Sequence, residues 1–187
     1  MRAVYPGTFD PPTVAHLAIV EAVLSAYRPT ALDLVLSRRP ILKEHVERPR
    51  LDHRIEVVAA SVAHLDAVSV AVTEQRLIAD IAAGYDLVVM GADKWHQIND
   101  IVFYDDDAHR RRCLDALPTV IVVGRGDDPL PEDGARHLHV DMHTVSSTRA
   151  RQGDRAVMTD AARAFDDATG AWSDPARYDV WVARMRP

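Results

Sequence analysis

The sequence has very little cysteine: Cys113 is the only one among 187 residues. An intrachain disulfide is therefore excluded, and we expect a reducing, cytoplasmic setting, since no signal-peptide pattern precedes the first predicted strand. No run of about 18 apolar residues occurs, so we expect no membrane-spanning helix. The net charge of -6 provides no basic excess, and we expect no nucleic-acid or membrane partner.

Two common phosphate-binding signatures are also absent. Neither the G-x-G-x-x-G dinucleotide fingerprint nor the G-x-x-x-x-G-K-[ST] phosphate loop occurs. The histidines show no zinc-type spacing with cysteine or carboxylate partners, and the acidic run 105–107 lacks the glycine-spaced loop of a calcium site. We therefore expect no structural metal site, and a phosphate ligand would need a different kind of binding site.

Short apolar runs alternate with helical patterns along the whole chain. We predict strands at 2–5, 31–37, 67–72, 85–90, 119–123 and 137–140. Helices are predicted at about 13–27, 50–64, 74–83, 94–98, 108–116 and 147–152. The continuous apolar runs at 87–90 and 120–123 are typical of strands covered on both faces. This pattern predicts an α/β fold: a doubly wound, Rossmann-like parallel sheet with helices on both faces.

The chain length suits one domain, with room for a small appendage. We predict a Rossmann-like domain over residues 1–157. Two amphipathic patterns, at about 158–168 and 176–185, predict a C-terminal helical extension over 158–187 that packs on the same domain. Trp172, Tyr178 and Trp181 are the side chains that we expect to make this packing.

The most informative segment is YPGTFDPPTVAH, residues 5–16. Gly7 interrupts the first strand with a residue that lets the backbone approach a ligand closely. Thr13 is a suitable N-cap for the first helix, which places His16 in that helix's first turn. The start of a helix suits a phosphate, and an imidazole can donate a further hydrogen bond to charge that develops on it.

A second segment, HTVSSTRAR at residues 143–151, has a related character. Its hydroxyls either cap the free N–H groups of a helix or bind phosphate oxygens, and an Arg just inside the helix supplies a planar cationic fork. Alone, the pattern also fits a plain Ser/Thr cap with solvated Arg side chains. Its pairing with the first segment, about 130 residues earlier, favours phosphate binding.

Both segments resemble signatures of the nucleotidylyltransferase superfamily. The first resembles the Gly-Thr/Ser-Phe-Asp-Pro turn and the following Thr/His-x-Gly-His motif, with Ala15 where the family has Gly. The second resembles the late Ile-Ser-Ser-Thr-x-x-Arg element. The resemblance spans about residues 3–152. It implies transfer of a nucleoside monophosphate, AMP from ATP, to a small phosphorylated acceptor, with release of pyrophosphate and with Mg²⁺ as cofactor.

The resemblance also implies roles for individual residues. The catalytic residues would be His16, Lys43 and Arg151. The acceptor would be bound by Lys43, Arg54 and Trp95. The nucleotide would be bound by Gly7, Thr8, Phe9, Thr13, His16, Gly91, Asp93, Ser146, Ser147, Thr148 and Arg151.

The acceptor is indicated by fewer residues. The segment Gly91-Ala92-Asp93 resembles the Gly-x-Asp element of nicotinate mononucleotide adenylyltransferases, so nicotinate or nicotinamide mononucleotide is the expected acceptor. The opening YPGTFDP resembles phosphopantetheine adenylyltransferases, but MGADK at 90–94 replaces the Arg-Gly-Leu-Arg pattern of that family. Phosphopantetheine adenylyl transfer, cytidylyl transfer and a non-catalytic nucleotide-binding protein on the same scaffold are the alternatives. The sequence leaves the oligomeric state open, including a homo-oligomer.

Overall fold

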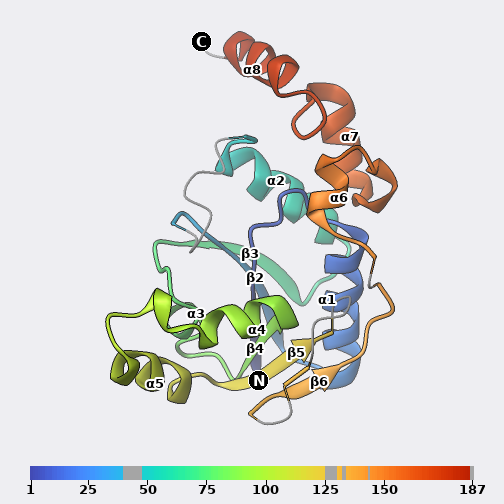
Figure 1. Cartoon of the computed structure of the whole chain (residues 1–187). Helices are drawn as coiled ribbons and strands as arrows, with labels where there is room; N and C mark the ends of the chain where they lie inside the picture. Colours follow the sequence, from blue (N-terminus) through green and yellow to red (C-terminus); the bar gives the residue numbers. More distant parts are fainter. Residues whose placement is uncertain (40–47, 125–129, 132–133, 143, 186–187) are drawn as a thin grey trace.

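The computed structural model describes residues 1–39, 48–124, 130–131, 134–142 and 144–185. Within this part of the chain, six parallel strands form one sheet in the order β3-β2-β1-β4-β5-β6 (Figure 1). The strands are β1 (Arg2–Pro6), β2 (Ala31–Ser37), β3 (Val68–Thr73), β4 (Leu87–Gly91), β5 (Thr119–Val123) and β6 (Arg136–Leu138). This architecture confirms the predicted doubly wound parallel sheet.

Helices cover both faces of the sheet. The longer ones are α1 (Val14–Tyr27), α2 (Leu51–Val62), α4 (Ala92–Asn99), α5 (Asp107–Asp115), α7 (Asp160–Thr169) and α8 (Pro175–Arg184). The short ones are α3 (Ile78–Ile81), η1 (Ile101–Phe103), α6 (Ser147–Arg151) and η2 (Arg155–Val157). One apolar cluster joins the sheet to α1 and α2, and another joins it to α3 and α4. Within the described residues, each helix is too short or too polar to cross a membrane.

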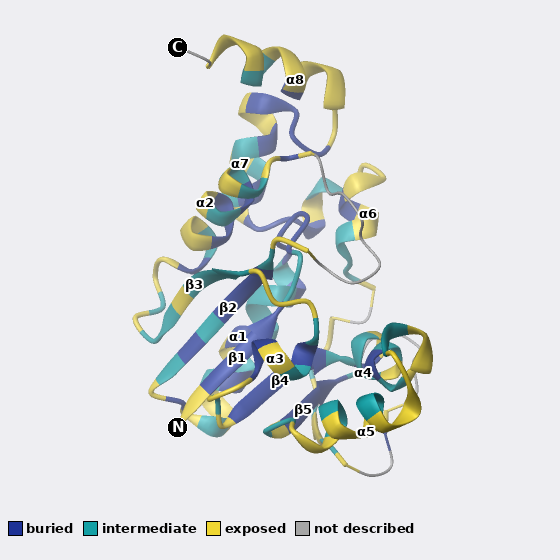
Figure 2. Ribbon diagram, turned by 90° about the vertical axis from the view of Figure 1, so that its left-hand side faces the viewer, coloured by how far each residue is buried: buried dark blue, intermediate teal, exposed yellow. Residues whose placement is uncertain are grey.

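The continuous apolar runs are explained by the alternation of side chains along each strand. Along β4, Val89 packs in the cluster with α1 and α2, whereas Val88 and Met90 pack in the cluster with α3 and α4. All three are essentially inaccessible to solvent, as the dark blue strands of Figure 2 show. Burial of one such side chain contributes about 1.5–3 kcal/mol, so both faces of the sheet must be apolar.

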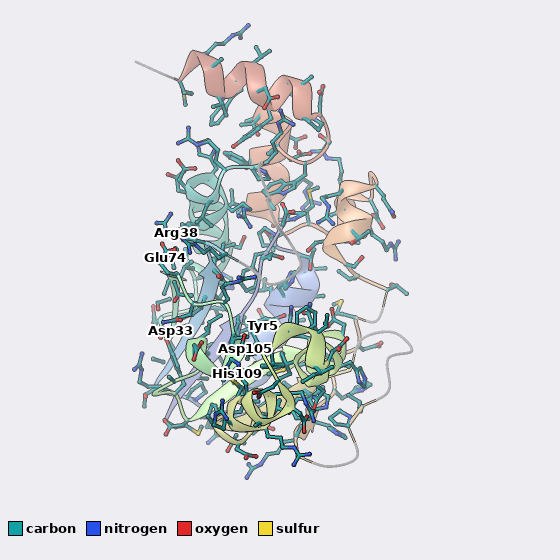
Figure 3. The ribbon with its side chains drawn as sticks, turned by 60° about the vertical axis from the view of Figure 1, so that its left-hand side comes forward. Tyr5, Asp33, Arg38, Glu74, Asp105 and His109 are labelled. Carbon is teal, nitrogen blue, oxygen red and sulfur yellow. The ribbon has the colours of Figure 1, made fainter. Side chains whose placement is uncertain are left out.

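The predicted boundaries differ from the structure mainly after β3. The prediction of a helix over 74–83 was wrong in extent, because only Ile78–Ile81 is helical. Side chains hold the preceding residues in a turn instead: the Gln75 N–H donates to Thr73 Oγ1 (3.1 Å), and Ser37 Oγ donates to the Gln75 carbonyl (2.6 Å). Arg38 and Glu74, labelled in Figure 3, pair at 3.1 Å beside this turn.

The predicted strand at 85–90 begins two residues later, at Leu87. The side chain of Tyr85 donates instead to Asp33 of β2, at 2.6 Å. Partial burial opposes ionisation of Asp33, but hydrogen bonds from Ser69, Tyr85 and Arg2 outweigh it and hold the pKa of Asp33 below its usual value. Burial, together with the hydrogen bond to Asp33, raises the pKa of Tyr85 to about 12.

The C-terminal helices α7 and α8 stack beyond α2, at the end of the molecule where β1 leads into α1 (Figure 1). A third apolar cluster joins Val57 of α2 to Trp172 and Tyr178. Tyr178 is 1 % exposed, and its hydroxyl accepts a hydrogen bond from the Arg50 N–H at the start of α2 (2.8 Å). The C-terminal segment is therefore tied to the body both by apolar packing and by hydrogen bonds.

Candidate functional site

A cavity of about 460 Å³ lies beyond the carboxyl ends of β1, β4 and β5. The strand order reverses between β1 and β4, because β1 leads into α1 on one face and β4 into α4 on the other. Ligands of open α/β sheets bind in the crevice at such a point. The structure brings nine of the predicted nucleotide-binding residues to the lining: Gly7, Thr8, His16, Gly91, Asp93, Ser146, Ser147, Thr148 and Arg151.

The ring of Phe9 packs against the turn after β1. The Gly7 N–H donates to the Val35 carbonyl (3.0 Å) and so extends the β1–β2 pairing. A Cβ on Gly7 would lie 2.7 Å from the ring of Phe9. Phe9 is 1 % exposed, and its backbone has a positive φ of 44°. Phe9 was predicted to touch the nucleotide, but it lies outside the cavity lining and packs on Tyr5 and His16.

His16 is held in one tautomer by the start of α1. The backbone N–H of Thr13 donates to His16 Nδ1 (3.0 Å), so this nitrogen is an acceptor and the proton of the neutral ring is on Nε2. Thr13 is fully buried and does not line the cavity, so its predicted contact with the nucleotide is replaced by a contact with His16. Ala15, the residue before His16, also lines the cavity.

The second motif contacts the first directly. Ser146 caps α6 by accepting the Arg149 N–H (3.1 Å), and Ser147 Oγ donates to the Pro11 carbonyl (2.8 Å). Arg151 Nη1 donates to the Asp10 carbonyl and lies 3.5 Å from Asp10 Oδ2. The Arg151 side chain is 36 % exposed and lines the cavity, so its guanidinium is positioned before a ligand arrives.

Arg54 does not reach the cavity, where it was predicted to bind the acceptor. Its side chain is buried among α2, the turn after β1 and the C-terminal segment, and its Nη1 donates to the Thr8 carbonyl (2.9 Å). Burial lowers the pKa of the Arg54 guanidinium, while the nearby carboxylate of Asp10 opposes the change. Arg54 therefore stabilises the turn after β1 through its hydrogen bond to Thr8 and lies outside the cavity lining.

Asp93 occupies space that only a glycine leaves open. A Cβ on Gly91 would lie 2.5 Å from Asp93 Oδ1, so the missing side chain makes room for the carboxylate. The φ of Gly91 is −74°, which any residue adopts, so the requirement is steric. Gly91 is also the N-cap of α4, which leaves Asp93 in the first turn with an exposed carboxylate on the cavity.

Trp95, which was predicted to bind the acceptor, lies outside the cavity lining. It packs against the apolar cluster that joins the sheet to α3 and α4, beside Gly134. Five polar or aromatic residues from the segments that follow β3 and β4 line the cavity and were not predicted: Arg76, Lys94, Gln97, Phe103 and Tyr104. Their position after strands that end at the ligand-binding edge was the available signal.

Tyr104 is a constrained aromatic residue of the cavity lining. Its hydroxyl donates to the Ile98 carbonyl (2.7 Å), which fixes the ring against α4. Burial raises the pKa of this hydroxyl, with a further contribution from Cys113. The hydroxyl of this lining residue is therefore engaged with α4.

Lys43 lies outside the described residues. Among those that the structure describes, no group of three or more His, Cys, Asp or Glu side chains is arranged to hold a metal ion. Asp93 is the single carboxylate among the described lining residues. A divalent cation at this site would therefore draw most of its ligands from a bound phosphate chain and from water.

Comparisons with known proteins agree with this geometry. A family model described as Cytidylyltransferase-like matches residues 4–153. Among solved structures, the Plasmodium falciparum nicotinic acid mononucleotide adenylyltransferase, complexed with NaAD, superposes with a TM-score of 0.65. The match covers 89 % of this chain and 94 % of that protein at 13 % sequence identity, which demonstrates a shared fold.

Proposed function

We propose that this chain, which belongs to the cytidylyltransferase-like family and is a nucleotidyltransferase, transfers AMP from ATP to nicotinate or nicotinamide mononucleotide. The observation that carries the proposal is the convergence of His16, Asp93 and Arg151 on one cavity at the point where the strand order reverses. The cavity thus contains a hydrogen-bond donor for a phosphate oxygen, a carboxylate that can bind Mg²⁺ and a cation for the phosphate chain. A nucleoside triphosphate with its metal ion needs all three.

In this reaction an oxygen of the acceptor phosphate attacks the α-phosphorus of ATP. A new P–O bond forms, the bond from the α-phosphorus to the bridging oxygen breaks, and pyrophosphate leaves. No covalent enzyme intermediate is needed, so the chain acts by positioning and by stabilising charge. His16 Nε2–H donates to the α-phosphate oxygen, where charge develops in the transition state.

The triphosphate end is assigned to the second motif. Thr148 and Arg151 line the cavity, and Arg151 Nη2 donates to Thr148 Oγ1 at 3.3 Å. A guanidinium presents up to five N–H donors, so its contacts with Asp10 and Thr148 leave donors for the β- and γ-phosphates. Ser147 holds α6 against the first motif, and Ser146 caps the same helix, so the two serines together place the side chains of Thr148 and Arg151.

Magnesium is proposed as part of the ATP complex. Mg²⁺ in such sites is bound by one or two carboxylates, by phosphate oxygens and by water, and Asp93 provides a carboxylate on the cavity. The ion would neutralise charge on the departing pyrophosphate.

The acceptor assignment is supported by the aromatic lining. Phe103 and Tyr104 present rings against which a flat pyridine ring can pack, and Arg76 and Lys94 add positive charge for a phosphate or carboxylate. The solved protein of the same fold acts on nicotinic acid mononucleotide, as its name states. We assign the ring-binding role to Phe103 and Tyr104 in place of Trp95.

The test is a substrate matrix. The protein is incubated with Mg²⁺ and either ATP or CTP, together with nicotinate mononucleotide, nicotinamide mononucleotide or phosphopantetheine, and both pyrophosphate and the dinucleotide product are measured. We expect product with ATP and a pyridine mononucleotide. Product only with CTP, or only with phosphopantetheine, would replace the proposed substrates. ATP binding without pyrophosphate from any pair would identify a binding protein.

A further inference from the structure

We propose that Trp172, in the turn between α7 and α8, is a positioning residue for the triphosphate site and acts through Asp10 on Arg151. The inference rests on one part of the proposed function, the binding of the ATP triphosphate by Arg151. Trp172 lies beyond residue 153, where the match to the family model ends. The segment after the matched region would thus contribute to the site without touching the substrate.

The two oxygens of the Asp10 carboxylate have different partners. Asp10 is 5 % exposed, and its Oδ1 accepts the indole N–H of Trp172 at 2.8 Å. Its Oδ2 lies 3.5 Å from Arg151 Nη1, which also donates to the Asp10 backbone carbonyl. The indole therefore occupies one carboxylate oxygen and leaves the other for a long contact with Arg151.

The indole is itself held rigidly. Asp166 is 1 % exposed, and its Oδ1 accepts the backbone N–H groups of Trp172 (2.8 Å) and Ser173 (3.0 Å). Gly170, with φ 76°, ends α7, and a Cβ there would lie 2.9 Å from the Asp174 carbonyl. The turn is therefore constrained on both sides of Trp172, which is 5 % exposed.

The consequence for Arg151 follows from carboxylate geometry. A free carboxylate beside a guanidinium frequently forms a bidentate pair, which consumes two N–H donors and draws the cation toward it. The hydrogen bond from Trp172 prevents this by fixing the rotation of the Asp10 carboxylate. Arg151 stays near Asp10, where its position is defined, but keeps donors directed to the cavity. Loss of the indole N–H would let Asp10 capture Arg151.

The experiment measures ATP affinity by calorimetry in the whole 187-residue chain, in parallel with turnover. Trp172→Phe removes the indole N–H and keeps an aromatic ring in the cluster. Trp181→Phe is the matched control, because its ring stacks on Tyr178 in the same cluster. We expect Trp172→Phe to weaken ATP binding by about tenfold, the scale of one hydrogen bond to a charged group, and Trp181→Phe to change it by less than about twofold.

A double-mutant cycle separates positioning from general damage. If Trp172 acts through Arg151, Trp172→Phe should change ATP affinity by less than about twofold when Arg151→Gln is already present. Unchanged affinity in the single variant, or an equal loss in both backgrounds, would overturn the inference. Because ATP binding needs no acceptor, the expected affinity pattern without product formation would reject the proposed function and leave the inference intact.

Discussion

Replacement of His16 by alanine tests the centre of the proposed mechanism. The imidazole makes two separate contributions: its Nδ1 accepts the Thr13 N–H at 3.0 Å, and in the proposed mechanism its Nε2–H donates to the α-phosphate. The first contribution stabilises the start of α1, whereas the second is used only when a phosphate is bound. The variant should therefore have a small effect on folding and a large one on turnover.

The two magnitudes can be estimated separately. Loss of the acceptor for the Thr13 N–H removes one capping interaction, which costs about 1 kcal/mol and lowers the melting temperature by about 2–4 °C in a chain of this size. Loss of a preorganised donor to charge that develops in the transition state costs about 2.7–4 kcal/mol, or about 10²–10³ in kcat. ATP affinity should change much less, because the donor acts mainly in the transition state.

Glutamine at the same position should separate the two effects. Its Oε1 can accept the Thr13 N–H while its Nε2 donates, much as the two ring nitrogens do. We expect His16→Gln to melt close to the parent protein and to turn over faster than His16→Ala.

The assay is pyrophosphate release at saturating ATP and acceptor at 25 °C, with ATP affinity and thermal unfolding measured on the same samples. His64→Ala is a suitable control, because His64 is exposed beyond the end of α2. Turnover of His16→Ala within about threefold of the parent protein would refute the proposed role, since a lost transition-state donor costs at least about 10².

Three other substitutions test the geometry. Gly7→Ala should lower the free energy of unfolding, measured with urea, by about 1–3 kcal/mol, because its Cβ would lie 2.7 Å from the buried Phe9 ring. An unchanged free energy of unfolding would contradict this packing. Gly91→Ala should change unfolding by less than about 0.5 kcal/mol but lower turnover, because its Cβ displaces only the flexible Asp93 carboxylate, 2.5 Å away. Tyr85 has its pKa raised to about 12, so its stabilisation is complete below about pH 10 and is lost as the pH rises through 12. The melting temperature of Tyr85→Phe should depend less on pH across that range than that of the parent protein. The same pH dependence in both proteins would count against the raised pKa of Tyr85.

Local pattern was sufficient for most of the fold. A strand buried on both faces must be apolar at successive positions, so the runs in β4 and β5 predicted strands and a parallel sheet. The shortened α3 was not predictable in this way, because Ser37, far away in the sequence, bonds to Gln75 and holds that segment in a turn. Tertiary contacts override the helical pattern there.

In the candidate site, too, some features follow from neighbouring residues and others depend on tertiary packing. Thr13 and His16 are three residues apart, so their hydrogen bond follows from the geometry of a helix start. The roles of Arg54 and Trp95 depend on what packs around them. The residues next to Arg54 in α2 and Trp95 in α4 do not indicate that these side chains are buried. Likewise, the residues next to Phe103 and Tyr104 do not indicate that these side chains line a cavity.

The sequence by itself therefore determined the fold class, the two phosphate-directed motifs and the family resemblance, because each depends on residue type and short-range spacing. Only the tertiary structure decided which side chains meet. Asp10 and Trp172 are separated by 162 positions, yet their 2.8 Å hydrogen bond joins the C-terminal segment to the proposed triphosphate site. Such a contact depends on how the helices pack, and packing is a property of the whole chain.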